Sequence, residues 1–180
     1  ENVTTGANFT TVGPWGFARK FGSTGSAAGQ LDEPNDVAVD ASSGAVYVAD
    51  SGNHTLRKVT SGGVVTTLAG VAGSSGSADG TGSFARFNAP FGVAVDASGS
   101  NIYVGDTMNH TIRVVTSDGT VTTLAGTAGT PGSADGTGAA ALFQRPEGVT
   151  VDAAANVYVA DYANHTIRKI NSSGVVTTLA

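Results

Sequence analysis

The chain has 180 residues, 40% of them hydrophobic and 13% charged, and its net charge at pH 7 is −5. The chain is too apolar to be disordered. The dispersed Lys and Arg residues form no basic patch, and no apolar run reaches the roughly 20 residues of a membrane helix, so we expect no nucleic-acid partner and no membrane insertion. The absence of cysteine excludes disulfides and thiol catalysis. The 26 glycines and the many Thr, Ser, Ala and Val residues favour strands joined by turns, and we expect almost no helix.

The first 30 residues precede a regular pattern and differ from it. Thr10 stands at the same distance before Pro34 as Thr66 stands before Pro90, so "NFTTVG" aligns with the last strand of a unit whose other strands are missing. The alternating segment at 15–23, "WGFARKFGS", is a second candidate for this leftover outer strand. The sequence begins without methionine or a signal peptide, and we therefore expect a processed or excised segment.

Three similar units follow, and each begins near a proline: Pro34, Pro90 or Pro146. After each proline comes a short apolar strand ending in Asp, then "AVYVAD", "NIYVGD" or "NVYVAD", then "NHTLRKV", "NHTIRVV" or "NHTIRKI", and finally a strand such as "GVVTTLA". We expect four strands in each unit. The predicted units are 31–70, 90–126 and 146–180, and the glycine-rich segments 71–89 and 127–145 are expected to be long loops between them.

The polarity of the strands increases from the first to the fourth in each unit. The first strand is apolar on both faces, as expected for a strand packed on two sides, whereas the third and fourth contain Thr, Arg and Lys. This gradient predicts the blade of a β-propeller, whose first strand lines the axis and whose last strand contacts water. An apolar residue three positions before each proline is expected to pack between neighbouring blades: Leu31, Phe87 and Phe143.

These motifs identify a family resemblance. The pattern "PxGVAVD…NxYVADxxNHTIRKI…GxVTTLAG" closely resembles the NHL repeat, with "NHT" followed by Leu or Ile in all three copies. The resemblance implies an all-β fold, a β-propeller that is commonly six-bladed in this family. It also implies that the chain serves as an interaction domain, as most similar propellers do, although some NHL-like propellers are metal-dependent lyases or lactonases.

Three blades are too few to close a propeller, which takes about 4 to 8. The chain is therefore expected to form an open half-propeller with two uncovered apolar faces. Either two chains combine as a twofold ring of six blades, or the blades belong to a longer array. We expect an obligate homo-oligomer or a piece of a longer propeller chain.

The recurring Asp-x-x-Asn-His-Thr segment lies between the second and third strands of each blade. Asp and Asn favour turns, and an Arg at a fixed offset is expected to bind a carboxylate within or between blades. Because a catalytic site is normally single, a feature present in every blade is interpreted as structural. The residues of this turn motif are Asp50, Asn53, His54, Arg57, Asp106, Asn109, His110, Arg113, Asp161, Asn164, His165 and Arg168.

No metal site or cofactor is predicted. The three histidines belong to three different blades, whereas zinc needs three or four ligands at one point. Calcium at the "SADGTG" segments of Asp79 and Asp135 stays an open alternative, although these segments lack a third carboxylate. The Asn-x-Thr triplets are also glycosylation sequons, which the repeat explains without glycans, and this too stays open.

Function is expected where the three blades differ from one another. The variable positions at the turns and at the starts of the first strands should surround the mouth of the propeller channel. They are Asn35, Asp36, Phe91, Met108, Glu147 and Tyr162. Exposed apolar and aromatic side chains suit a protein partner, so we expect a non-catalytic interaction or scaffold module. Neutral drift at exposed turns is the alternative.

Two other functions remain as alternatives. The first alternative is a structural subunit of an extracellular assembly or filament, joined through its open faces. The second is a lyase- or lactonase-like enzyme. The enzyme is disfavoured because all three His residues belong to the repeats and no Gly-x-Ser-x-Gly motif is present. Few Lys residues with many Thr and Gly suggest an extracellular or cell-surface location.

Overall fold

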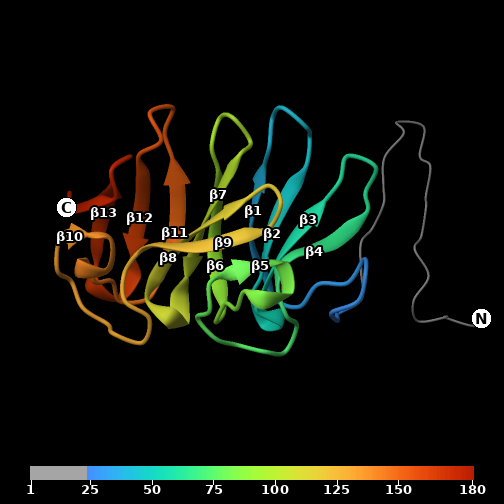
Figure 1. Cartoon of the computed structure of the whole chain (residues 1–180), viewed down its shortest axis with the longest axis horizontal. Coiled ribbons are helices and arrows are strands. Elements are labelled where there is room, and N and C mark those ends of the chain that lie inside the picture. Colours follow the sequence, from blue (N-terminus) through green and yellow to red (C-terminus); the bar gives the residue numbers. More distant parts are fainter. Residues whose placement is uncertain (1–23) are drawn as a thin grey trace, which may run out of the picture.

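The computed structural model describes residues 24–180, so both candidates for the predicted leftover strand lie outside the described residues. The described chain forms three antiparallel sheets that stand side by side as blades (Figure 1). Its only helical elements are 3-10 turns of three residues, and among the described residues no helix is long and apolar enough to cross a membrane. The expectation of an all-β, open partial propeller is confirmed.

Each blade is a meander of four consecutive strands. The first consists of β1 (Pro34–Val39), β2 (Val46–Asp50), β3 (Thr55–Val59) and β4 (Val65–Gly70). The second consists of β6 (Pro90–Val95), β7 (Asn101–Asp106), β8 (Thr111–Thr116) and β9 (Thr120–Ala125). The third consists of β11 (Pro146–Val151), β12 (Val157–Asp161), β13 (Thr166–Ile170) and β14 (Val175–Thr178). The 3-10 turns are η1 (Ser51–Asn53), η2 (Gly82–Phe84), η3 (Thr107–Asn109), η4 (Gly138–Ala140) and η5 (Tyr162–Asn164).

Each blade has the four predicted strands, but the glycine-rich segments between blades are not plain loops. β5 (Gly80–Thr81) pairs with β9, and β10 (Gly136–Thr137) pairs with β14, so the second and third sheets have five strands. Each short strand covers the free edge of an outer strand, which otherwise leaves backbone groups unpaired. The contact of Thr81 Oγ1 with Thr120 Oγ1 at 3.0 Å reinforces this pairing.

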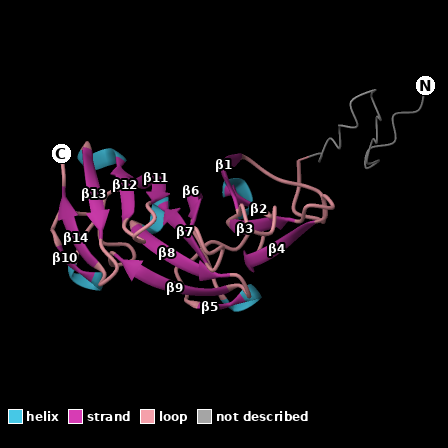
Figure 2. Ribbon diagram, turned by 90° about the horizontal axis from the view of Figure 1, so that it is seen from above, coloured by secondary structure: helices cyan, strands magenta, loops and turns pink. Residues whose placement is uncertain are grey.

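The blades fan out as an arc, with β1, β6 and β11 on its concave side and β4, β9 and β14 on its convex side (Figure 2). The apolar core lies between blades. One cluster joins Tyr47 and Leu56 to Val93 and Val104, and a second joins blade two to blade three. Phe87 is fully buried in the first cluster and Phe143 in the second, whereas Leu31 is only partly buried.

The first strand of the first blade is not packed on both sides as the apolar pattern predicted. Val37 and Val39 are each 58% exposed, while Val93, which corresponds to Val37 in the second blade, is 3% exposed. The difference arises because the second blade has a neighbour on that side. Burial of an apolar strand face therefore depends on whether another blade packs against it, and not only on the strand's own sequence.

Candidate binding face

The connection between the second and third strands of each blade is a single 3-10 turn that ends in a left-handed residue. That residue is His54, His110 or His165, with φ of 57°, 61° and 56°. Backbone N–H groups tie each turn to the segment that precedes the first strand, as in the bond from Met108 N to Asn88 O at 3.1 Å. The turns η1, η3 and η5 and the starts of β1, β6 and β11 thus form one edge of the arc, which we call the mouth face.

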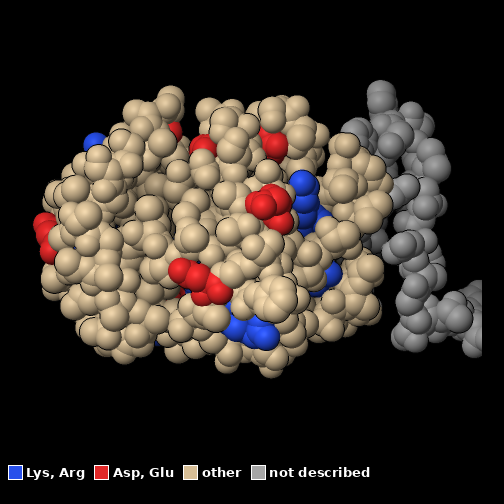
Figure 3. All heavy atoms as spheres, viewed as in Figure 1, with Lys and Arg blue, Asp and Glu red and all other residues tan. Residues whose placement is uncertain are grey.

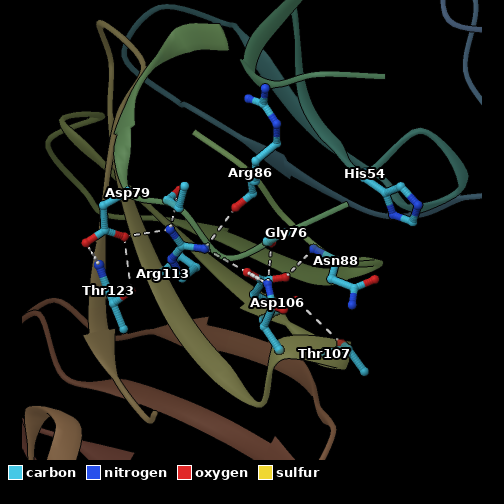
Figure 4. Close-up of polar contacts among 12 residues, drawn as sticks. His54, Gly76, Asp79, Arg86, Asn88, Asp106, Thr107, Arg113 and Thr123 are labelled. Atoms are coloured by element: carbon cyan, nitrogen blue, oxygen red, sulfur yellow. Dashed lines mark hydrogen bonds and ion pairs between the residues drawn. The ribbon is translucent and has the colours of Figure 1, made fainter. Parts of the chain in front are cut away.

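Beneath this face, the turn Asp is a buried hydrogen-bond acceptor (Figure 4). Asp106 accepts bonds from Asn88 N at 2.7 Å, Asn109 Nδ2 at 2.7 Å and Arg113 Nη1 at 2.8 Å. Burial raises the pKa of Asp106 to about 6, against the lowering effect of these donors.

The other two blades repeat this arrangement. Asp50 binds Arg57 at 3.0 Å, and Asp161 binds Arg168 at 3.0 Å. Both carboxylates also accept a bond from the Asn of their own turn, at 2.8 Å. All three Asp residues and their Arg partners are at most 1% exposed. The polar groups of the motif therefore bind one another rather than a ligand from solvent.

A second carboxylate binds the Arg in the second and third blades, and the sequence reasoning did not find this contact. Asp79 Oδ1 lies 2.6 Å from Arg113 Nη2, and Asp135 Oδ1 lies 2.8 Å from Arg168 Nη2. In the first blade Arg57 Nη2 binds Ala27 O, as Arg113 Nη2 binds Ala78 O in the second. The residue after Ala27 is a second alanine, whereas the other two blades have Asp at that position. Comparison of "SAAG" with the two "SADG" copies was the signal available in the sequence.

These Asp residues also hold the outer strand. Asp79 accepts bonds from Thr123 N at 3.2 Å and Thr123 Oγ1 at 3.0 Å, and Asp135 accepts one from Thr178 Oγ1 at 2.9 Å. Within residues 24–180 no group of three His, Asp or Glu side chains is placed to hold a metal ion. The geometry thus assigns Asp79 and Asp135 to an ion pair that fastens each inter-blade segment to its blade.

Polar contacts at the mouth face also join neighbouring blades. His54 Nδ1 accepts a bond from Ala89 N, and His110 Nδ1 accepts one from Arg145 N, each at 3.1 Å. The hydroxyl of Ser51 donates to Pro90 O, and that of Thr107 donates to Pro146 O at 2.7 Å. The histidine of the motif therefore positions the following blade.

The link through His110 predicts a dependence of stability on pH. Burial and, less strongly, the Arg145 charge lower the pKa of His110 from its ordinary value of 6.5, while Asp161 acts in the opposite direction. A histidine with a lowered pKa in the folded state contributes stability that is complete above about pH 6.5 and is lost as pH falls. We expect the contribution of His110 to stability to fall between about pH 7 and pH 5, while the raised pKa of Asp106 acts in the opposite direction with or without His110.

The substitution His110→Gln tests this dependence, because the glutamine carbonyl accepts a hydrogen bond but does not titrate. The urea midpoint of the unmodified chain should fall relative to that of the variant as pH falls across this range. An identical decline in both proteins would show that His110 does not contribute.

Two of the predicted site residues make contacts that serve the fold. Asn35 Nδ2 donates to Ser51 Oγ at 2.6 Å. Asp36 accepts bonds at 2.9 Å from Val37 N and from Val93 N, so it joins β1 to β6. These contacts engage Asn35 Nδ2 and both carboxylate oxygens of Asp36 within the fold.

Three of the remaining predicted site residues have exposed side chains, whereas that of Glu147 is 22% exposed. Phe91 is 36%, Met108 47% and Tyr162 55% exposed, and all three lie on the mouth face. The structure adds Arg145, whose guanidinium lies 5.7 Å from the Tyr162 ring centroid and 3.9 Å from a Glu147 carboxylate oxygen. Sequence reasoning missed Arg145, although the residue before each proline varies between the blades as Glu, Ala and Arg.

The charged side chains on one face of the molecule form no patch of a single sign. On the face shown in Figure 3, acidic and basic side chains occur as small separate groups of both signs. The mouth face is therefore distinguished by exposed apolar side chains that differ between blades.

Residues 23–179 match the family model described as the SMP-30/gluconolactonase/LRE-like region. The curated NHL repeat-containing protein 2 of Gallus gallus is 38% identical over 92 residues, which are 51% of this chain and 12% of that protein. Its Homo sapiens counterpart is 35% identical over 89 residues, with coverage of 48% and 12%. The chain thus spans only a small part of these relatives.

Solved structures share the fold. A structural genomics protein of unknown function from Bacteroides thetaiotaomicron is 27% identical, with a TM-score of 0.65 and coverage of 83% of this chain and 36% of that one. A chain of a nidogen/laminin complex is 20% identical, with a TM-score of 0.62 and coverage of 83% and 49%.

Proposed function

The chain belongs to the SMP-30/gluconolactonase/LRE-like family and carries NHL repeats, and we propose that it is a non-catalytic binding module whose mouth face holds a protein partner. The observation that carries this proposal is the contrast between buried and exposed positions of one turn. The buried Asp and Arg are the same in all three blades, whereas the residues between Asp and Asn are Ser-Gly, Thr-Met and Tyr-Ala, of which Met108 and Tyr162 are exposed and Ser51 and Thr107 are buried.

The exposed residues define the chemistry of the partner. Phe91, Met108 and Tyr162 contribute apolar side chains from the second and third blades, and Arg145 beside Tyr162 contributes a positive charge. Aromatic residues, Met and Arg are enriched at protein interfaces, and they carry most of the binding energy when they are desolvated at the centre of one. A protein segment with apolar side chains suits this surface.

The same contacts favour binding over catalysis. The motif carboxylates are buried against Arg, and the Nδ1 atoms of His54 and His110 already accept backbone hydrogen bonds. A general base needs a free acceptor within hydrogen-bond reach of its substrate. These groups instead serve the turn and the joints between blades.

The proposal is tested with peptides selected from a random display library against the folded chain. Combined replacement of Phe91, Met108 and Tyr162 by alanine is expected to weaken binding of the selected peptides by at least about 30-fold, since the loss of even one interface anchor costs about 2 kcal/mol. Affinity is measured by calorimetry, and far-UV circular dichroism verifies that the variant is folded.

The matched control removes exposed apolar side chains from elsewhere. Val64 is 56% and Phe84 is 79% exposed, and neither belongs to the mouth face. The variant with Val64→Ala and Phe84→Ala should bind the peptides as the unmodified chain does. If this variant loses binding and the mouth-face variant keeps it, the mouth face is not the binding surface.

A further inference from the structure

Equivalent positions of the repeat are buried between blades but exposed at the two ends of the arc. The third-strand residues Leu56 and Ile112 are fully buried, whereas Ile167, at the same position in the last blade, is 43% exposed. The first-strand residue Val93 is 3% exposed, whereas its counterpart Val37 in the first blade is 58% exposed. The chain has two interfaces between blades, one between the first and second and one between the second and third. Each end of the arc exposes a surface equivalent to one side of these interfaces.

The end of the third blade is hollowed. Apolar surface lines a hollow of about 350 Å³, bordered by Gly148, Tyr158, Ala160 and Ile167. In the second blade the corresponding surface is covered by the third: a Cβ added at Gly105 would lie 3.3 Å from Val149 Cγ2. The residue of the first blade that corresponds to Val149 is Val37, which stands exposed at the other end of the chain.

The register of the strands makes the two ends complementary. Val37 is paired with Val48, and Val39 with Val46, as Val149 is paired with Val159 and Val151 with Val157. We call the side formed by Val37, Val39, Val46 and Val48 the first end face, in which Val37 and Val39 are exposed and Val48 is already buried. The side formed by Gly148, Thr150, Tyr158, Ala160 and Ile167 is the last end face. The first end face is therefore equivalent to the surface of blade three that packs on blade two. The last end face is equivalent to the surface of blade two that packs on blade three.

We propose that the occupant of these faces is a second copy of this chain, with the last end face of each copy docked on the first end face of the other. Val37 of one copy fills the hollow beside Ala160 of its partner. Each copy has both surfaces, so the contact is heterologous, and two such contacts close a ring. Two copies supply enough blades for closure, which takes about 4 to 8, whereas three copies exceed that number.

A backbone hydrogen bond supports the same pairing. His54 and His110 each accept a bond from the residue before the next proline, Ala89 or Arg145, and both of those residues have a positive φ. In the ring, His165 of one copy meets Glu33 of the other, whose φ of 46° matches theirs of 49° and 55°. The hydroxyl link made by Ser51 and Thr107 has no counterpart there, because Tyr162 occupies that position.

Sedimentation measurements on the chain test the docking. The unmodified chain should sediment with twice its mass of 17.7 kDa. The substitutions Val37→Asp and Ile167→Asp each place a charge in a contact that burial makes apolar, and each should weaken the dimer by on the order of 100-fold or more. Val64→Asp, at a residue 56% exposed outside both end faces, should leave the dimer intact.

A mixture of the two variants distinguishes this arrangement from other dimers. The Val37→Asp variant keeps an unaltered last end face, and the Ile167→Asp variant keeps an unaltered first end face. The mixture should therefore form a heterodimer through one intact contact, whereas each variant alone should be monomeric. A dimer made by two first end faces would instead survive Ile167→Asp. The proposal is overturned if the unmodified chain is monomeric at all concentrations, or if it forms open polymers in place of a dimer. It is also overturned if the chain does not bind itself but does bind a separate protein made of blades of the same repeat. Circular dichroism verifies folding, and Ile167→Ser replaces Ile167→Asp if the latter unfolds.

Discussion

The substitution Asp106→Ala should lower the free energy of unfolding by about 3–5 kcal/mol, because it leaves Arg113 buried without its principal counter-charge. It also removes the acceptor for Asn109 Nδ2 and Asn88 N. Domains of this size have total stabilities of about 5–15 kcal/mol, so the loss is a large fraction of the whole. Urea unfolding at pH 7 measures it.

Asp79→Ala is the matched control for this prediction. Its side chain is 49% exposed, and the buried pair of Asp106 with Arg113 remains when it is removed. The first blade already has alanine after Ala27, so the blade tolerates this change, and we expect a loss of about 1 kcal/mol. Equal losses for the two variants would contradict the assignment of Asp106 as the centre of the network.

Gly92→Ala should destabilise the protein by about 3 kcal/mol, because the joint between the second and third blades has no room for a methyl group. An added Cβ would lie 2.1 Å from Glu147 O and 2.8 Å from Val149 N, both of them backbone atoms. Relief requires β11 to move away from β6, which opens the core around Val149 and Tyr103. The urea midpoint of the variant measures the cost.

The control is Gly148→Ala, at the same repeat position one blade further on. There the nearest atom to an added Cβ is the Ala160 Cβ at 3.5 Å, an ordinary contact. Both substitutions are compared in a Val37→Asp background, so that docking between copies does not enter the measurement. Gly148→Ala should change stability by less than about 1 kcal/mol, and a similar loss at both glycines would mean that the close approach at Gly92 is not the cause.

Much of this architecture could be predicted from the chain because the three units can be compared with each other. The constant spacing of the prolines predicted the blades, and the recurring Asp, Asn, His and Arg were interpreted as a turn scaffold. The structure places Asp106 and Arg113 at 2.8 Å. A network made by residues close in sequence, such as Asp106, Asn109 and Arg113, can be inferred from spacing because one hairpin brings them together.

Contacts between distant segments could not be inferred in this way. Asp79 reaches Arg113 from an inter-blade segment that the composition marked only as glycine-rich, and Asp36 bonds to Val93 in another blade. Both carboxylates have ordinary sequence neighbours, and only the folded chain brings their partners within reach. The same holds for β5 and β10, since a strand of two residues has no periodicity of its own.

The sequence by itself determined the all-β class, the three repeated blades, the turn motif and the positions where the blades differ. Those features depend on local preferences and on comparison of one unit with the next. The tertiary structure alone decided which carboxylate meets which Arg, which histidine holds the following blade, and which valines remain exposed at the ends of the arc. These outcomes depend on how neighbouring blades pack, and Val37 and Val93, identical in type and repeat position, differ in exposure because only one of them faces a neighbouring blade.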